Sequence, residues 1–261
     1  MQDASSDQRA VLRVENVSKY FGAIEALADV SMAVHPGEIV GLVGDNGAGK
    51  STLIKCISGV HQPSAGSIFI DGESVRFSDP ADARSMGIET VYQHLGLVDE
   101  LDVAGNLFLG REEMSGGWLG RMFNWLNLKG MRQEATEALE SLHIKIPDPS
   151  APVESMSGGQ RQAVAIGRTV FWGRKLLLLD EPTAALGVEE SEQVLSLLER
   201  LRDQGLPLLV ISHNMQHVYR IADRIVVLRR GRKVADLVRT ETTPQEIVGH
   251  ITGALAITDV L

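Results

Sequence analysis

The sequence has little cysteine, few aromatic residues and no long apolar segment. Cys56 is the only cysteine among the 261 residues, so no disulfide can form within the chain, and a reducing cytosol is its expected compartment. No apolar run reaches the roughly 18 residues of a membrane-spanning helix. Residues 1–8 are polar and acidic and lack the apolar centre of a signal peptide. We therefore expect any role at a membrane to depend on a partner protein.

The sequence also lacks an excess of basic residues. It carries 25 Lys and Arg residues against 34 Asp and Glu, a net charge of -9, which argues against broad contact with nucleic acid. With 44% hydrophobic and 23% charged residues, the composition is that of a globular protein rather than a disordered one. The length suits one large domain or two lobes around one core.

A phosphate-binding loop is the most specific motif present. Its residues are Gly44-Asp45-Asn46-Gly47-Ala48-Gly49-Lys50-Ser51, of the form G-x-x-x-x-G-K-S. The glycines allow backbone N–H groups to point inward, and the helix expected from Thr52 adds its positive end. Lys50 would reach the β- and γ-phosphates, and Ser51 would ligate Mg²⁺. The apolar strand over residues 38–43 makes a chance glycine-rich turn the weaker interpretation.

Apolar periodicity predicts an α/β chain. Strands are predicted over residues 11–20, 26–35, 38–43, 87–92, 175–179 and 208–211, and hairpins over residues 68–77 and 224–238. Helices are predicted over residues 80–86, 102–108, 131–142, 157–170, 189–202 and 244–251. We expect the β segments around the phosphate loop to form an antiparallel layer beside a parallel core, and residues 95–173 to be mainly helical.

An acidic pair follows the leucine-rich strand that ends at Leu179. In proteins with a phosphate loop, an aspartate at the place of Asp180 reaches Mg²⁺, usually through water. The adjacent Glu181 is placed to polarise an attacking water as a general base. The alternative is a simple acidic end to a strand.

A second small-residue turn, Ser157-Gly158-Gly159-Gln160, begins a predicted helix. Like the phosphate loop, it would present free N–H groups at the positive end of a helix. One chain already has its own phosphate loop, so a second such turn suits the γ-phosphate of ATP bound to another subunit. The similar Ser115-Gly116-Gly117 lacks the glutamine and a following amphipathic helix, and it is interpreted as a loop.

Three single residues complete the candidate site. Gln93 ends a strand and would touch Mg²⁺ or the attacking water. His213 ends another strand and would hydrogen-bond the γ-phosphate. Phe21 would stack on adenine, although a lone Phe more often lies in a core. His213 and His217 are spaced as a pair of helix ligands, but the absence of a nearby Glu or Cys argues against zinc.

Together these residues resemble the ATP-binding cassette (ABC) ATPase family over about residues 11–238. Each motif of that family has a counterpart here: Gly44–Ser51 (Walker A), Gln93 (Q-loop), Met156–Gln160 (signature, with Met for Leu), Leu176–Asp180 (Walker B), Glu181 (catalytic glutamate) and His213 (switch histidine). The resemblance places Phe21 as the adenine-stacking aromatic, with Tyr20 as the alternative.

One position departs from the family pattern. Gly187 stands where the family usually has an aspartate that crosses the dimer, which questions how tightly the two ATP sites communicate. Residues 98–112 and 182–189 resemble the ATPases of bacterial monosaccharide importers of the ribose, xylose and fructose type. Many of those carry two cassettes in tandem, so the single cassette here is closer to the fructose type.

The resemblance implies a P-loop NTPase (RecA-like) core with a parallel sheet, an antiparallel β layer and a helical signature subdomain. These would form one nucleotide-binding domain. Its expected parts are residues 11–93 and 174–238 (core), 94–173 (helical subdomain) and 239–261 (C-terminal tail).

It also implies Mg²⁺-dependent ATP hydrolysis that drives sugar uptake. Two cassettes would face head to tail, with each ATP between Gly44–Ser51 of one and Ser157–Gln160 of the other. They would sit on the cytoplasmic face of the plasma membrane, on an integral membrane permease served by a periplasmic sugar-binding protein. The alternative is a soluble ABC ATPase that acts on nucleic acid or ribosomes, but such proteins generally carry coiled-coil insertions or paired cassettes. The apolar loop Trp118–Trp125 would contact either the permease or its own helical lobe.

Overall fold

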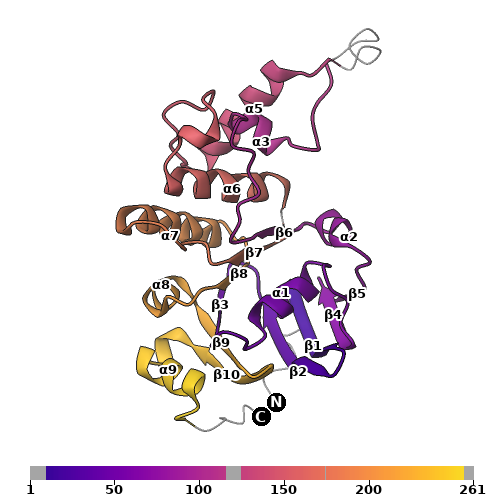
Figure 1. The fold of residues 1–261 in the computed structure, drawn as a ribbon. Helices are drawn as coiled ribbons and strands as arrows, with labels where there is room; N and C mark the ends of the chain where they lie inside the picture. Colours follow the sequence, from indigo (N-terminus) through magenta and orange to yellow (C-terminus); the bar gives the residue numbers. More distant parts are fainter. Residues whose placement is uncertain (1–9, 116–124, 174, 256–261) are drawn as a thin grey trace. The chain divides into compact units, whose positions relative to one another are not determined.

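The computed structural model describes residues 10–115, 125–173 and 175–255. The chain divides into two compact units (Figure 1). The first comprises residues 1–93, 173–182 and 198–261, and the second comprises residues 94–172 and 183–197. Most of the Trp118–Trp125 loop and most of Ser115-Gly116-Gly117 lie outside the described residues. Trp125, which is described, is exposed.

A six-stranded sheet forms the base of the first unit. Its strands lie in the order β10 (Arg232–Val238), β9 (Arg224–Arg229), β3 (Ile39–Val43), β8 (Leu208–Ile211), β7 (Leu176–Asp180) and β6 (Ile88–Val91). All neighbours pair in parallel except β9 and β10, which form a hairpin. Every residue of β3 and β8 is buried, as expected for strands of a parallel sheet covered on both faces.

A four-stranded antiparallel sheet belongs to the same unit. It has the order β2 (Ile24–Val34), β1 (Leu12–Phe21), β4 (Ala65–Ile70) and β5 (Glu73–Val75). The β4–β5 turn has φ of 50° at Asp71 and 83° at Gly72, so both central residues are left-handed, as a tight hairpin turn requires. The parallel core and antiparallel layer confirm the predicted fold class.

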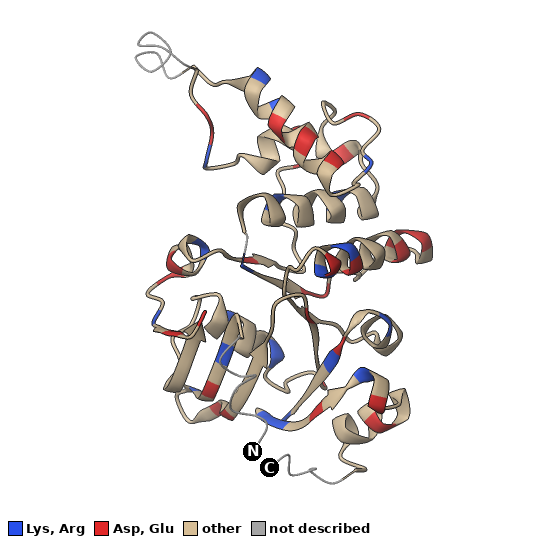
Figure 2. Cartoon of the chain, turned by 180° about the vertical axis from the view of Figure 1, so that it is seen from behind, with Lys and Arg blue, Asp and Glu red and all other residues tan. Residues whose placement is uncertain are grey.

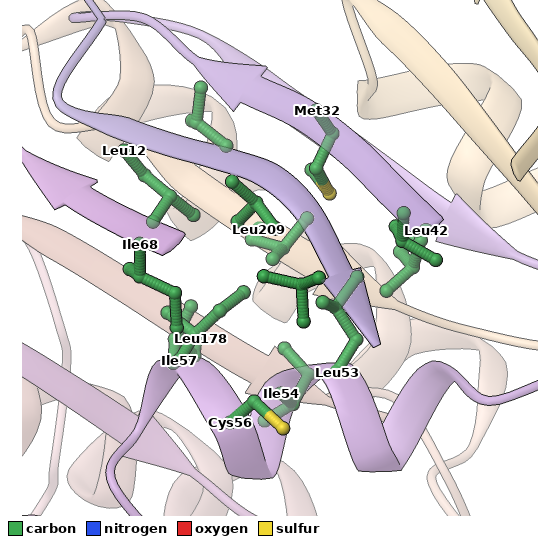
Figure 3. Packing of buried hydrophobic residues seen from close by; sticks show 14 of the residues in the cluster. Leu12, Met32, Leu42, Leu53, Ile54, Cys56, Ile57, Ile68, Leu178 and Leu209 are labelled. Carbon is green, nitrogen blue, oxygen red and sulfur yellow. The ribbon is translucent and has the colours of Figure 1, made fainter. Parts of the chain in front are cut away.

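One apolar core joins these layers through α1 (Lys50–Ile57), the helix that follows the phosphate loop. Figure 3 shows Leu53, Ile54 and Ile57 of that helix packed among residues of both sheets. Cys56 is buried in this cluster, and burial raises the pKa of its thiol to about 11. The thiol therefore acts as a small core side chain, because a protonated and buried thiol is a poor nucleophile.

The second unit is helical. It contains α3 (Val103–Leu107), α5 (Leu128–Ser141), the short 3-10 helix η2 (Val153–Ser155) and α6 (Gly158–Trp172), and α7 (Val188–Asp203) begins in it. The Phe108 ring contacts the rings of Phe171 and Trp172 edge to face. The buried amide of Asn106 bonds the backbone of Val98, Leu101 and Asp102, so it fixes the segment that enters the unit. The predicted helical character of this region is confirmed.

The remaining helices differ from the sequence expectation in two places. α1 begins at Lys50 rather than Thr52, because Gly49 adopts φ of 104° and starts the helix earlier. α8 (Met215–Ile221) was not predicted. The helices predicted over residues 80–86 and 244–251 are confirmed as α2 (Pro80–Ser85) and α9 (Pro244–Thr252), and the short 3-10 helix η3 (Arg239–Glu241) precedes α9. Within the described ranges, no helix combines the length and apolar character needed to cross a bilayer.

Candidate functional site

The phosphate loop owes its shape to glycines in left-handed or related conformations. The φ angle is 148° at Gly44, 79° at Gly47 and 104° at Gly49. A Cβ at Gly44 would lie 2.1 Å from the carbonyl oxygen of Leu228, and one at Gly49 would lie 2.8 Å from that of Ala26. Glycine is therefore required at both positions for backbone conformation and for space. No atom lies within 4 Å of a Cβ at Gly47, so only φ favours glycine there.

Lys50 lies inside this loop. Its Nζ donates to the carbonyl oxygen of Gly44 at 2.7 Å and to that of Asp45 at 3.0 Å. The residue is 9% exposed, and burial lowers the pKa of its amine, while the carboxylates of Glu181, Asp180 and Asp45 act in the opposite direction. The loop thus holds its own cation among backbone carbonyls, next to acidic groups.

The other residues of the loop face solvent, as an accessible phosphate site requires. Asp45, Asn46, Gly47 and Ser51 are exposed, and Thr52 is half-buried. Ala48 is the exception: it is buried, and its carbonyl accepts the N–H of Gly231 at 3.0 Å. That bond ties the loop to the β9–β10 turn.

The acidic pair and the histidine meet at the carboxyl ends of β7 and β8. Asp180 pairs with Ile211 in the parallel ladder, and the N–H of Glu181 donates to the Ile211 carbonyl at 2.9 Å. His213 Nδ1 lies 2.9 Å from Glu181 Oε2, with the histidine side chain 76% exposed and the glutamate side chain 15% exposed. Glu181 has φ of 56°, which is rare outside glycine and is typical of functional turns.

Burial raises the pKa of Asp180, and the neighbouring Glu181 carboxylate raises it further. The cations Lys50 and Lys55 act in the opposite direction without cancelling the shift. Asp180 therefore carries its negative charge at an electrostatic cost in the absence of a bound cation.

The oxygen donors at this edge fit Mg²⁺ only when other ligands accompany it. Throughout the described ranges, no group of three or more His, Cys, Asp or Glu side chains is arranged to hold a metal ion. Mg²⁺ commonly takes one or two protein oxygens and completes its octahedron with waters and substrate phosphates. The Ser51 hydroxyl, the Asp180 carboxylate and the Gln93 amide are the oxygens that would serve such an ion. Gln93 is exposed just beyond β6.

The two aromatic candidates lie at the exposed end of β1. Phe21 is 43% exposed and Tyr20 is 46% exposed, so neither is a core residue. The Phe21 ring contacts His61 edge to face, and Lys19 Nζ lies 5.2 Å from the ring centroid. Tyr20 instead donates its hydroxyl to Glu25 at 2.9 Å. Both rings are therefore accessible at this end of β1.

The second candidate turn begins α6 in the helical unit. The N–H of Gln160 donates to Ser157 Oγ at 3.3 Å, and the N–H of Ser157 donates to Gln160 Oε1 at 2.9 Å. This reciprocal pair is a capping box. The glutamine of the motif therefore stabilises the start of the helix, which leaves Ser157 and Gly158 exposed at its tip.

Sequence reasoning missed one residue at this turn. The N–H of Gly159 donates to Glu190 Oε1 at 3.1 Å, and Glu190 also accepts from Gly187. The available signal was a glutamate in the first turn of the predicted helix after Gly187, but its bond to Gly159 joins segments far apart in the sequence.

The structure therefore places the predicted residues in two groups. Lys50, Asp180, Glu181 and His213 gather in the first unit, and Ser157–Gln160 belong to the second.

Comparisons with known proteins identify the family to which this chain is similar. Residues 27–184 match the family model described as "ABC transporter". A xylose/arabinose import ATP-binding protein of Sulfolobus acidocaldarius is 48% identical over 93% of this chain and 94% of its own length. A fructose import ATP-binding protein of Rhizobium meliloti is 43% identical over 95% of each chain. A galactofuranose transporter ATP-binding protein of Escherichia coli K12 is 38% identical, and the match spans only 48% of its length.

Solved structures give the same result. A nucleotide-free ATP-binding cassette from an ABC transporter superposes with a TM-score of 0.78 at 26% identity, covering 96% of this chain and 98% of that one. Another cassette, in its ADP conformation, gives a TM-score of 0.78 at 27% identity, covering 93% of this chain and 95% of that one. These matches confirm the resemblance predicted from the motifs, including the likeness to cassettes of sugar importers.

Proposed function

Because this chain belongs to the ABC transporter family and is one of its ATP-hydrolysing cassettes, we propose that it drives the import of a monosaccharide through a separate membrane permease. The observation that carries this proposal is the group formed by Lys50, Asp180, Glu181 and His213 at one edge of the parallel sheet. The fructose and the xylose/arabinose import proteins that match nearly the full chain support a monosaccharide as cargo.

In the proposed cycle, the N–H groups of Gly44–Ser51 and Thr52 hold the phosphates of ATP, and Phe21 stacks on the adenine. Lys50 leaves the carbonyls of its own loop and donates to the β- and γ-phosphates instead. Bound Mg²⁺, held by Ser51, Asp180 and Gln93, would neutralise phosphate charge in the transition state.

Glu181 is proposed to accept a proton from the attacking water. Its carboxylate is oriented by His213, the arrangement expected of a general base held by a second polar group. In the presence of ATP, the exposed imidazole would also reach the γ-phosphate. When that phosphate leaves, Glu181 and His213 would lose their contacts with it.

A second cassette is proposed to complete each site. Its turn Ser157–Gln160 would donate to the γ-phosphate from the opposite side, so that ATP joins two copies and hydrolysis releases them. A solved cassette is described as dimeric in a post-hydrolysis state bound to ADP and phosphate, which supports this step. The chain would thereby work as a peripheral subunit at the cytoplasmic face of the plasma membrane, with a periplasmic sugar-binding protein supplying the cargo.

The two compact units are proposed to be parts of one nucleotide-binding domain. The proposed division assigns residues 11–93 and 174–238 to the core and residues 94–173 to the helical subdomain. Residues 183–197 pack with the second unit, so the boundary after β7 differs from this sequence-based division.

The test is to express tagged Glu181→Gln in its native cell and identify what co-purifies from detergent-solubilised membranes with ATP present. We expect a multi-spanning permease, whose binding protein can then be screened against monosaccharides. Lys50→Ala in the same background is the matched control, because it should lose nucleotide binding and with it the ATP-dependent complex. A wholly soluble protein that captures ribosomes or nucleic acid would overturn the import proposal.

A further inference from the structure

The carboxylate of Glu190 collects donors from two separate turns of the second unit. Oε1 accepts the N–H of Gly159 at 3.1 Å, and Oε2 accepts the N–H of Gly187 at 3.1 Å. The Ser157 side chain also hydrogen-bonds this carboxylate. The Gly159 bond, followed by the Gly187 and Ser157 bonds, holds the pKa of Glu190 below its ordinary value, so the group is an anion at neutral pH.

The start of α7 explains the position of this side chain. Gly187 directly precedes the helix and Glu190 is its third residue, so the bond from Gly187 N–H to Oε2 is one half of a capping box. The other half would come from a side chain at position 187, which glycine lacks. Figure 2 shows the acidic residues gathered at this end of α7.

The glycines around this carboxylate differ in the space they leave. A Cβ at Gly159 would lie 2.8 Å from Glu190 Cβ, whereas one at Gly187 would lie 3.8 Å from Glu190 Oε2 and meet nothing else within 4 Å. The close approach of Gly159 to Glu190 depends on glycine. At Gly187 the aspartate usual in the family would place a second carboxylate beside the first, and like charges at such a distance repel. Gly187 and Glu190 are therefore compatible as a pair.

We propose that Glu190 is a positioning residue of the ATPase cycle whose carboxylate occupies the signature turn as an internal anion. The terminal phosphate of ATP on a second cassette would then bind that turn by displacing the carboxylate. This inference rests on the proposed function, in which Ser157–Gln160 contact the ATP of the partner cassette.

Displacement follows from the donors themselves. The Gly159 N–H and the Ser157 hydroxyl hydrogen already serve one anion, and a phosphate oxygen needs the same hydrogen atoms. Two anions within hydrogen-bonding distance of one donor pair also repel each other. Glu190 thus raises the ATP concentration at which two cassettes associate. Its return to Gly159 after hydrolysis favours their separation.

The experiment measures the ATP concentration that gives half-maximal dimer, by sedimentation of the full chain carrying Glu181→Gln. Glu190→Gln keeps the side-chain size but removes the charge, and we expect it to lower this concentration by roughly 5- to 20-fold, the effect of losing one charge-assisted hydrogen bond. ATP binding to the isolated monomer should remain unchanged, because Glu190 does not belong to the phosphate loop. Thermal unfolding checks that both proteins are folded.

Two further variants separate the contact from general charge. Glu189→Gln removes the same charge from the exposed neighbouring residue, and we expect its half-maximal ATP concentration to stay within about 2-fold of the parent, because a solvated charge acts weakly. Glu190→Asp keeps the charge but shortens the reach, and we expect it to behave as Glu190→Gln does. If Glu190→Asp matches the parent, or Glu190→Gln dimerises no more readily than the parent, the inference is wrong and the proposed function stands. If the Glu181→Gln parent forms no ATP-dependent dimer, the head-to-tail proposal fails and this inference fails with it.

Discussion

Among the described residues, the two candidate phosphate-binding turns both begin a helix, and they hold charged side chains of opposite sign. In Gly44–Ser51 the charged side chain is a cation, because Lys50 donates to carbonyl oxygens of its own loop. In Ser157–Gln160 the charged side chain is an anion, because Glu190 accepts the N–H of Gly159, 31 residues earlier in the sequence.

This difference implies different conditions for binding a nucleotide. A phosphate that enters the first turn gains a cation that is already present, so that turn is suited to bind ATP in a single chain. A phosphate that enters the second turn must remove an anion first. This requirement agrees with the proposed role of the second turn, in which it meets ATP already held by a partner cassette rather than free nucleotide.

The largest expected effect comes from a change that leaves both turns intact. Glu181→Gln should lower kcat by roughly 10²- to 10⁴-fold, because it removes the proposed general base while keeping the side-chain shape. The ATP affinity of the monomer should stay within about 2-fold, since neither turn loses a donor. Steady-state hydrolysis and equilibrium nucleotide binding measure the two quantities, and turnover at the wild-type rate would contradict the assigned role.

Breaking the first turn should strongly destabilise the protein. Gly44→Ala places a Cβ 2.1 Å from the Leu228 carbonyl oxygen, and we expect a loss of about 3 kcal/mol or more in the free energy of unfolding. Gly47→Ala is the matched control, with the same loop and a positive φ but open space. It should lose only about 1–2 kcal/mol. Urea denaturation measures the free energy of unfolding of both variants. Equal losses would show that the steric clash with Leu228 does not determine the stability of the loop.

Breaking the second turn should have a smaller effect on the fold and none on nucleotide binding by the monomer. Gly159→Ala forces a Cβ to within 2.8 Å of Glu190 Cβ, and we expect a loss of about 1–3 kcal/mol. Gly187→Ala, where the Cβ has ordinary contacts, should lose less than about 1 kcal/mol. Urea denaturation with parallel ATP titrations checks both parts. A weakened monomer affinity for ATP in Gly159→Ala would show that the two turns are not independent.

The smallest expected effect concerns the acidic group beside Lys50. The pKa of Asp180 is raised by burial and by Glu181, so its ionised form destabilises the nucleotide-free fold above that pKa. Asp180→Asn should therefore raise Tm by about 2 °C at pH 7.5. The gain should shrink as the pH falls through the raised pKa, because wild-type Asp180 then becomes protonated and is neutral like the asparagine of the variant. Thermal unfolding without nucleotide, followed from pH 7.5 down to the most acidic pH at which the protein stays folded, measures this, and a gain that grows at lower pH would contradict the assignment.

Much of the fold and of the first turn could be predicted because the responsible interactions are local. The leucines of β7 and the apolar residues of β3 predict buried strands directly, and the spacing of Gly44, Gly49 and Lys50 predicts an anion-binding loop. α8 was missed because its seven residues form too short a helix for a clear apolar stripe, although Asn214 caps its first turn.

By itself the sequence determined the α/β class, the phosphate loop, the acidic pair and the family, since each depends on neighbouring residues or on one strand–loop–helix unit. Only the tertiary structure decided the contacts that close over a long span. It brought His213 to Glu181 at adjacent strand ends, and it brought Glu190, in the first turn of α7, to Gly159, in the first turn of α6. Sequence periodicity does not reveal such pairs. A hydrogen bond requires its donor and acceptor to be placed to within a few tenths of an ångström, and only the folded chain sets that placement.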